Sequence, residues 1–138
     1  MSPRAAMRAA FAAIAVAAAI ASTGCGSSSK PAYCSTRSDL EQSVKDLGNV
    51  NLKTGGTSAL NAQLQKVKSN ATELEGSAKG DFPTETAAIQ SSVSALDTAV
   101  RSLPKSPTVQ ELAPIAVDVK NVANAVTGFT DATKPKCD

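Results

Sequence analysis

The stretch Ile89-Gln-Ser-Ser-Val93-Ser-Ala-Leu96-Asp-Thr-Ala-Val100-Arg-Ser-Leu103 decides the fold. Its large apolar residues follow one another at intervals of four, three, four and three positions, which places them on one face of an α-helix. Pro83 precedes the stretch and Pro104 follows it, as is typical of proline at the two ends of a helix. A helix with a single apolar face must bury that face against other elements.

Three further stretches repeat this spacing, and no segment alternates with the period of two that a strand requires. Their apolar residues are Leu40, Val44 and Leu47; then Leu60, Leu64, Val67, Ala71, Leu74 and Ala78; and then Leu112, Ile115, Val119, Val122, Val126 and Phe129. Short connections make neighbouring helices antiparallel. We therefore expect an all-α fold, an up-down-up-down four-helix bundle. The alternative is a coiled-coil dimer of long hairpins.

The ends of these helices have recognisable signals. Residues 38–41, Ser-Asp-Leu-Glu, fit a capping box at the start of the first helix. Ser106 and Pro107 suit the N-cap and first turn of the last one. Pro114 should kink that helix or divide it in two, because proline removes a hydrogen bond and clashes with the preceding turn. Residues 49–56 contain two Asn and two Gly and predict an irregular connection.

The N-terminus has the order of charges and apolar residues that directs export. Residues 1–8 contain two arginines and no acid, and Ala9–Ala21 is a run of 13 apolar residues. This run is too short for a membrane span of ~20 residues but suits the core of a signal peptide. Small residues follow at 22–24, directly before Cys25. The pattern predicts a signal peptide over residues 1–24.

Gly24-Cys25 and the Gly-Ser-Ser-Ser that follows resemble the lipobox and tether of bacterial lipoprotein precursors, although Ser22 stands where that family usually has Leu. The resemblance covers about the first 30 residues. It implies cleavage before Cys25, lipidation of the Cys25 thiol (a diacylglyceryl group with chains such as palmitate) and anchoring to the outer face of the cell membrane. We then expect a flexible lipidated tether over residues 25–33 and a helical bundle domain over 34–138. An ordinary secretory signal is the alternative.

With Cys25 lipidated, Cys34 and Cys137 remain, one at each end of the folded region. Exported proteins meet an oxidising environment, and two cysteines allow one pairing. We therefore predict a Cys34–Cys137 disulfide, which suits a bundle whose two termini lie at the same end. Two free thiols are the alternative. A zinc site is less favoured because the chain has no His and two thiolates do not complete a tetrahedral site.

The chain offers few residues for catalysis or nucleic-acid binding. It contains no His, so Ser–His and Cys–His catalysis are excluded. Arg4 and Arg8 account for the whole formal charge of +2, so removal of the signal peptide leaves a neutral protein without a basic stripe. Asp97, Glu111 and Asp118 fall on polar helix faces, where we expect solvated carboxylates. We predict no catalytic residue, cofactor, metal or nucleic-acid partner.

These features favour a non-enzymatic interaction or envelope-associated protein with a partner in the cell envelope. The alternative is a carrier or sensor of a small apolar ligand in the bundle interior. Small residues at Ala88, Ser92, Ala95 and Ala99 form a seam beside the apolar face of the third helix. The seam predicts either close helix packing or a groove for a helix or an acyl chain. Exposed apolar residues would favour a partner, and a void lined by alanines would favour a ligand.

Overall fold

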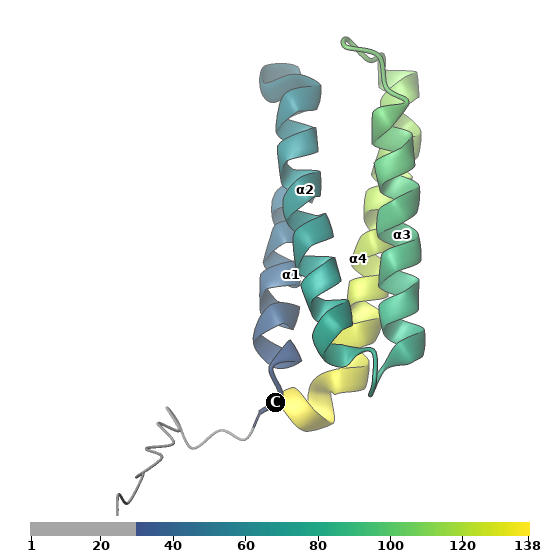
Figure 1. The fold of residues 1–138 in the computed structure, drawn as a ribbon. Coiled ribbons are helices and arrows are strands. Elements are labelled where there is room, and N and C mark those ends of the chain that lie inside the picture. Colours follow the sequence, from purple (N-terminus) through teal and green to yellow (C-terminus); the bar gives the residue numbers. More distant parts are fainter. Residues whose placement is uncertain (1–29) are drawn as a thin grey trace, which may run out of the picture.

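The computed structural model describes residues 30–138, except for the side chains of residues 52–54. Cys25 and the signal peptide predicted over residues 1–24 lie outside the described residues. The helices are α1 (Tyr33–Gly48), α2 (Leu52–Ala78), α3 (Pro83–Arg101) and α4 (Val109–Cys137). They form an antiparallel bundle (Figure 1), and this part of the chain contains no strand. The predicted fold class is confirmed.

The helices pack in a ring that follows the order of the chain. α2 packs on α1, α3 on α2 and α4 on α3, and α4 closes the ring against α1. This is the up-down-up-down arrangement. Because the chain crosses the bundle an even number of times, the start of α1 and the end of α4 lie at one end, which we call the foot (Figure 1). The α1–α2 and α3–α4 connections lie at the other end, the head.

The predicted apolar faces form the core. Every residue of the first two faces is buried, and the third and fourth faces are buried except for half-buried Leu103, Leu112 and Val119. Leu40, Leu64 and Leu96 are completely enclosed. Burying a side chain of this size stabilises the fold by about 1.5–3 kcal/mol relative to exposure. The same spacing that predicted the helices therefore supplies the packing that holds them together.

The start of α1 differs from the prediction. The helix begins at Tyr33, five residues before the expected Ser38, and its N-cap residue Ala32 provides no side-chain hydrogen bond. Tyr33 was placed in the tether, but its side chain is only 2% exposed. Ser38 lies inside the helix and donates to the Cys34 carbonyl. Burial of Tyr33 and the nearby disulfide stabilise the additional helical residues before Ser38. The helix therefore starts at the first residue that packs in the bundle, and not at the residue with the best capping side chain.

The start of α4 also differs, by two residues. Its N-cap is Thr108 rather than Ser106, and a complete capping box joins Thr108 to Glu111. The Thr108 backbone N–H donates to Glu111 Oε2 at 2.7 Å, and the Glu111 N–H donates to Thr108 Oγ1 at 3.3 Å. Ser106 has Val109 three residues later and cannot form this reciprocal pair. The box satisfies two backbone donors that would otherwise lack partners, which favours Thr108.

Two irregular positions were expected within or beside the helices. α4 is not divided at Pro114 and runs through it. Pro114 lies near the start of α4, where its missing N–H costs one hydrogen bond, to the Gln110 carbonyl, while neighbouring Ile115 stays buried. The connection after α1 is irregular as predicted, although residues 52–55 are helical. Gly56 breaks the helix with φ 57° and ψ −160°, in a region that favours glycine.

Candidate functional site

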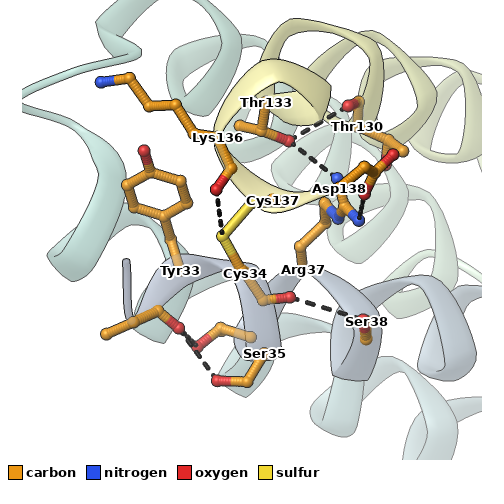
Figure 2. Close-up of a disulfide and its surroundings, with 12 residues drawn as sticks. Tyr33, Cys34, Ser35, Arg37, Ser38, Thr130, Thr133, Lys136, Cys137 and Asp138 are labelled. Atoms are coloured by element: carbon orange, nitrogen blue, oxygen red, sulfur yellow. Dashed lines mark hydrogen bonds and ion pairs between the residues drawn. A yellow bond between two sulfur atoms is a disulfide. The ribbon is translucent and has the colours of Figure 1, made fainter. Parts of the chain in front are cut away.

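The foot of the bundle is closed by a disulfide between α1 and α4. Cys34 and Cys137 are bonded with an S–S distance of 2.03 Å and Cα atoms 5.5 Å apart, across 103 residues of sequence. Figure 2 shows the bridge between the first turn of α1 and the last turn of α4, with Tyr33 on one side and Arg37 on the other. Cys137 is buried and Cys34 is half-buried. The predicted pairing is confirmed.

A polar network accompanies the disulfide. Arg37 of α1 donates to Asp138 Oδ1 at 2.8 Å and to Thr133 Oγ1 at 3.3 Å (Figure 2). Glu41, one turn further along α1, accepts a hydrogen bond from Thr130. The hydrogen bond from Arg37 lowers the pKa of the Asp138 carboxyl below its usual 3.8. The network therefore joins the same two helices as the disulfide by non-covalent contacts.

Three aromatic rings form the other half of the foot. Tyr33, Phe82 and Phe129 meet edge to face, with centroids 5.6–6.2 Å apart. The ammonium group of Lys136 lies 5.6 Å from the centre of the Phe82 ring. The rings come from α1, the α2–α3 connection and α4. Sequence analysis missed this cluster because only Phe129 belongs to an apolar face with helical spacing.

The predicted lipidation residue, Cys25, lies five positions before the first described residue, Lys30. The chain enters the bundle at Lys30 and Pro31, and these residues line a groove of about 400 Å³ beside the disulfide with Arg37 and Cys137. Whatever precedes Lys30 is therefore attached at the foot.

The three carboxylates singled out in the sequence do not converge. Asp97 is not fully solvated: its side chain is 18% exposed and pairs with Lys68 of α2 at 3.2 Å and with Arg101 at 3.0 Å. Glu111 caps α4. Asp118 lies half-buried on α4. Two of these carboxylates thus have structural partners that bridge or cap helices.

The head carries an apolar surface groove. A groove of about 300 Å³, which we call the head groove, opens beyond the end of α1. It is lined by Leu47, Gly48, Val50, Leu60, Leu112, Ile115, Ala116 and Val119. Val50 packs on the core. Val109 and Val117 of α4 are 82% and 59% exposed. They are the large apolar residues left at the surface of the described chain.

The small-residue seam of α3 does not form a groove along its length. Ala88 and Ala95 are exposed, and the Ser92 hydroxyl donates to the Ala88 carbonyl. Ala99 is half-buried against the core. The seam is therefore exposed to solvent at Ala88 and Ala95 and packs against the core at Ala99.

The chain matches no known protein family, no characterised protein and no solved structure. Within residues 30–138 no three side chains of His, Cys, Asp or Glu gather in a way that could hold a metal ion. None of the four helices in that range combines the length and the hydropathy needed to cross a bilayer. The foot and the head groove are thus the two candidate sites, and each has to be interpreted from its own chemistry.

Proposed function

We propose that this protein is a lipid-anchored, non-enzymatic interaction module on the outer face of a bacterial cell membrane, held there through Cys25. The order of the first 25 residues supports this proposal: a basic start, a short apolar run, small residues and then cysteine. The neutral charge of the remaining chain and its lack of His add to the support for binding over catalysis.

The geometry of the bundle indicates how such a module would stand on a membrane. Five residues from Cys25 to Lys30 span at most about 18 Å, so an anchor at Cys25 keeps the foot close to the lipid surface. After the break at Gly56, α2 continues for 22 residues to Ala78 and is about 33 Å long. The head would therefore point away from the membrane. Exposure of Val109 and Val117 at this far end is the observation that carries the proposal, because such residues favour a protein partner.

The anchor is tested by Cys25→Ser, with Ser27→Ala as the matched control in the same segment. In cells given radiolabelled palmitate, the unchanged protein and Ser27→Ala should be labelled and should sediment with membranes. Cys25→Ser should be unlabelled and should appear in the medium or as an uncleaved precursor, because stable attachment needs the acyl chains. Equal labelling of all three proteins would overturn the proposal.

The non-enzymatic character is tested at Asp118, the carboxylate without a capping or bridging role. A cellular phenotype of the deletion strain should be restored by Asp118→Asn as well as by the unchanged protein. Loss of function in this variant, with folding and anchoring intact, would instead indicate catalysis.

A further inference from the structure

The bundle consists of two helical hairpins. α1 and α2 form the first hairpin, and α3 and α4 form the second, each with its own connection at the head. Helices pack more extensively within a hairpin than between hairpins, because α1 contacts α2 more than α4 and α3 contacts α4 more than α2. The α1–α4 and α2–α3 contacts, which we call the hairpin boundary, are therefore the weaker part of the packing.

Both covalent links across the hairpin boundary lie at the foot. The Cys34–Cys137 bond joins α1 to α4, and residues 79–82 join α2 to α3. The ring cluster of the foot spans the same two hairpins. At the head, each connection joins two helices of one hairpin (Figure 1). The hairpins can therefore separate at the head with every covalent link intact, whereas they cannot separate at the foot.

The polar contacts across the hairpin boundary also lie toward the foot. On the α1–α4 side, Glu41 accepts a hydrogen bond from Thr130. On the α2–α3 side, the uppermost contact is the ion pair of Lys68 with Asp97, about 15 Å from the foot end of α2. Nearer the head, within the described ranges 42–50 and 55–67, no side chain forms a hydrogen bond or ion pair with α3 or α4. Packing of apolar side chains therefore holds the head portions together.

The packing along the hairpin boundary loosens toward the head. Grooves of about 260 Å³ and 230 Å³ follow the α1–α4 and α2–α3 contacts, and the head groove lies between the first hairpin and α4. Val50, Leu112 and Val119 are half-buried at the head, whereas Phe129 and Thr133 are completely buried near the foot. α2 and α3 converge at the foot and diverge toward the head (Figure 1). The boundary is thus tightly closed at one end.

We propose that the bundle opens at the head, with the two hairpins swinging apart about a hinge at the foot. The Cys34–Cys137 bond and residues 79–82 lie on the two sides of the hairpin boundary, and a line through them is the hinge axis. Hinge motions concentrate the backbone change in a few residues of a loop or a helix end. The opening gives access from the head to the apolar interior. This inference concerns the folded domain and does not depend on the anchor at Cys25.

Apolar burial makes the open form the minor one. Leu47, Leu60 and Ile115 are buried where the two hairpins meet at the head. Separation exposes part of their surface to water, and the cost grows with the apolar area exposed. The ion pair of Lys68 with Asp97 favours the closed form as well, because it joins the two hairpins. Loss of that pair should therefore shift the population toward the open form.

Distances between pairs of spin labels test the opening in the full chain, purified from the cells that make it. Labels attached through encoded non-cysteine amino acids leave the disulfide intact. The head pair, Ser58 and Ser102, spans the hairpin boundary and should show a major distance and a minor longer one. Two control pairs at exposed positions should each show one distance. Ser77 with Thr84 spans the boundary at the foot, and Ser102 with Asn121 lies within the second hairpin.

Removal of the uppermost ion pair should enlarge the longer component. Lys68→Gln takes away the cation that pairs with Asp97, so the share of the longer distance between labels at Ser58 and Ser102 should rise several-fold. Lys66→Gln changes an exposed lysine of the same helix and should leave that share unchanged. Circular dichroism and thermal melting of both variants check that they fold.

Each outcome decides for or against the hinge. A single narrow distance for the head pair in the unchanged protein and in both variants would overturn the inference. A longer component of equal size in either control pair would also overturn it, because it would indicate unfolding of single helices instead of movement of whole hairpins. Equal effects of Lys68→Gln and Lys66→Gln would do the same. Palmitate labelling of Cys25 reports on the anchor separately.

Discussion

The ring of Tyr33 meets the ring of Phe129 edge to face, with the centroids 6.2 Å apart. This contact joins the first residue of α1 to the last third of α4. The Tyr33 hydroxyl also donates to Asp81 in the α2–α3 connection, at a distance of 3.5 Å. One side chain at the edge of the tether therefore contacts two distant parts of the chain at the foot of the bundle.

Replacement of Tyr33 by Ala should destabilise the bundle by about 3–5 kcal/mol, the range for truncating a buried aromatic ring. Tyr33→Phe keeps the ring and loses the long hydrogen bond to Asp81, so it should cost at most about 1 kcal/mol. Chemical denaturation of the two variants measures both effects. A neutral Tyr33→Ala variant would mean that residue 33 belongs to the tether after all.

The Cys34–Cys137 bridge should leave neither of these thiols free in the absence of reductant. Closing a loop of about 100 residues stabilises a fold by about 4–5 kcal/mol in the chain-entropy account. Reduction should therefore lower the melting temperature while helical circular dichroism persists, because the core remains.

The control for the bridge is the double variant Cys34→Ser with Cys137→Ser. It should melt at the temperature of the reduced protein and should not respond to reductant. Quantitative thiol labelling of Cys34 and Cys137 in freshly extracted, unreduced protein is the result that would contradict the pairing.

The core prediction compares two nearby positions of α3. Leu96 is completely buried, and Leu96→Ala should cost about 2–5 kcal/mol. Ser94 is exposed, and Ser94→Ala should change the stability by no more than about 0.5 kcal/mol. Denaturant titration of both variants provides the comparison. Similar losses at the two sites would show that the buried face of α3 has been assigned wrongly.

The capping box of α4 should contribute measurably to stability. Thr108→Ala removes the side-chain oxygen that accepts from the Glu111 N–H and should cost about 1 kcal/mol. Ser106→Ala, at the position expected from the sequence, should be almost neutral because Ser106 does not cap the helix. Thermal melts of the two variants decide between the two starting points. A larger loss for Ser106→Ala would favour the earlier start.

Acid should weaken the link between Arg37 and Asp138. The pKa of Asp138 is lower in the folded protein than its unfolded value of about 3.8. The contribution of the Asp138 carboxylate to stability is therefore complete above the unfolded pKa and is lost as the pH falls through the folded pKa. The stability difference between the unchanged protein and Asp138→Asn should therefore be constant above about pH 5 and shrink below about pH 4.

Melting curves between pH 2 and pH 7 test this dependence on acid. In an Arg37→Gln background the largest cause of the lowered pKa is absent, so Asp138→Asn should change the shape of the curve much less. A difference that persists unchanged to pH 2 would contradict the assigned contact.

The four helices could be predicted because the local spacing of apolar residues is enough to identify the apolar face of each helix. Leu60 to Ala78, for example, keeps intervals of four and three over five steps, and all six residues are buried. Helix periodicity is a property of residues close together in sequence, so it can be recognised without knowing which other helices pack against that face. The disulfide was predictable for a related reason, since the expected export and an even number of helices together leave one arrangement for the two cysteines.

The helix starts and the partners of single polar residues could not be predicted in this way. Ser38 and Ser106 had good local capping signals, yet α1 begins at Tyr33 and α4 at Val109. Asp97 looked like a solvated carboxylate but reaches Lys68 on a neighbouring helix. For α1 and Asp97 the competing interaction comes from a residue distant in sequence, or from burial that exists only after the helices pack. The start of α4 is different, because Thr108 and Glu111 form a local capping box that competes with Ser106.

The amino-acid sequence by itself determined which residues of each helix are buried, because the alternation of apolar and polar positions decides which face avoids water. Tertiary structure alone decided which residues of α1, α2 and α4 meet beside the end of α1 to line the head groove. The physical reason is that a groove forms between side chains of different helices, so it depends on how long each helix is and where each one ends along the bundle. The Cys34–Cys137 bond fixes the start of α1 beside the end of α4 at the foot. The spacing of apolar residues within one helix does not show which residues of another helix lie beside its end.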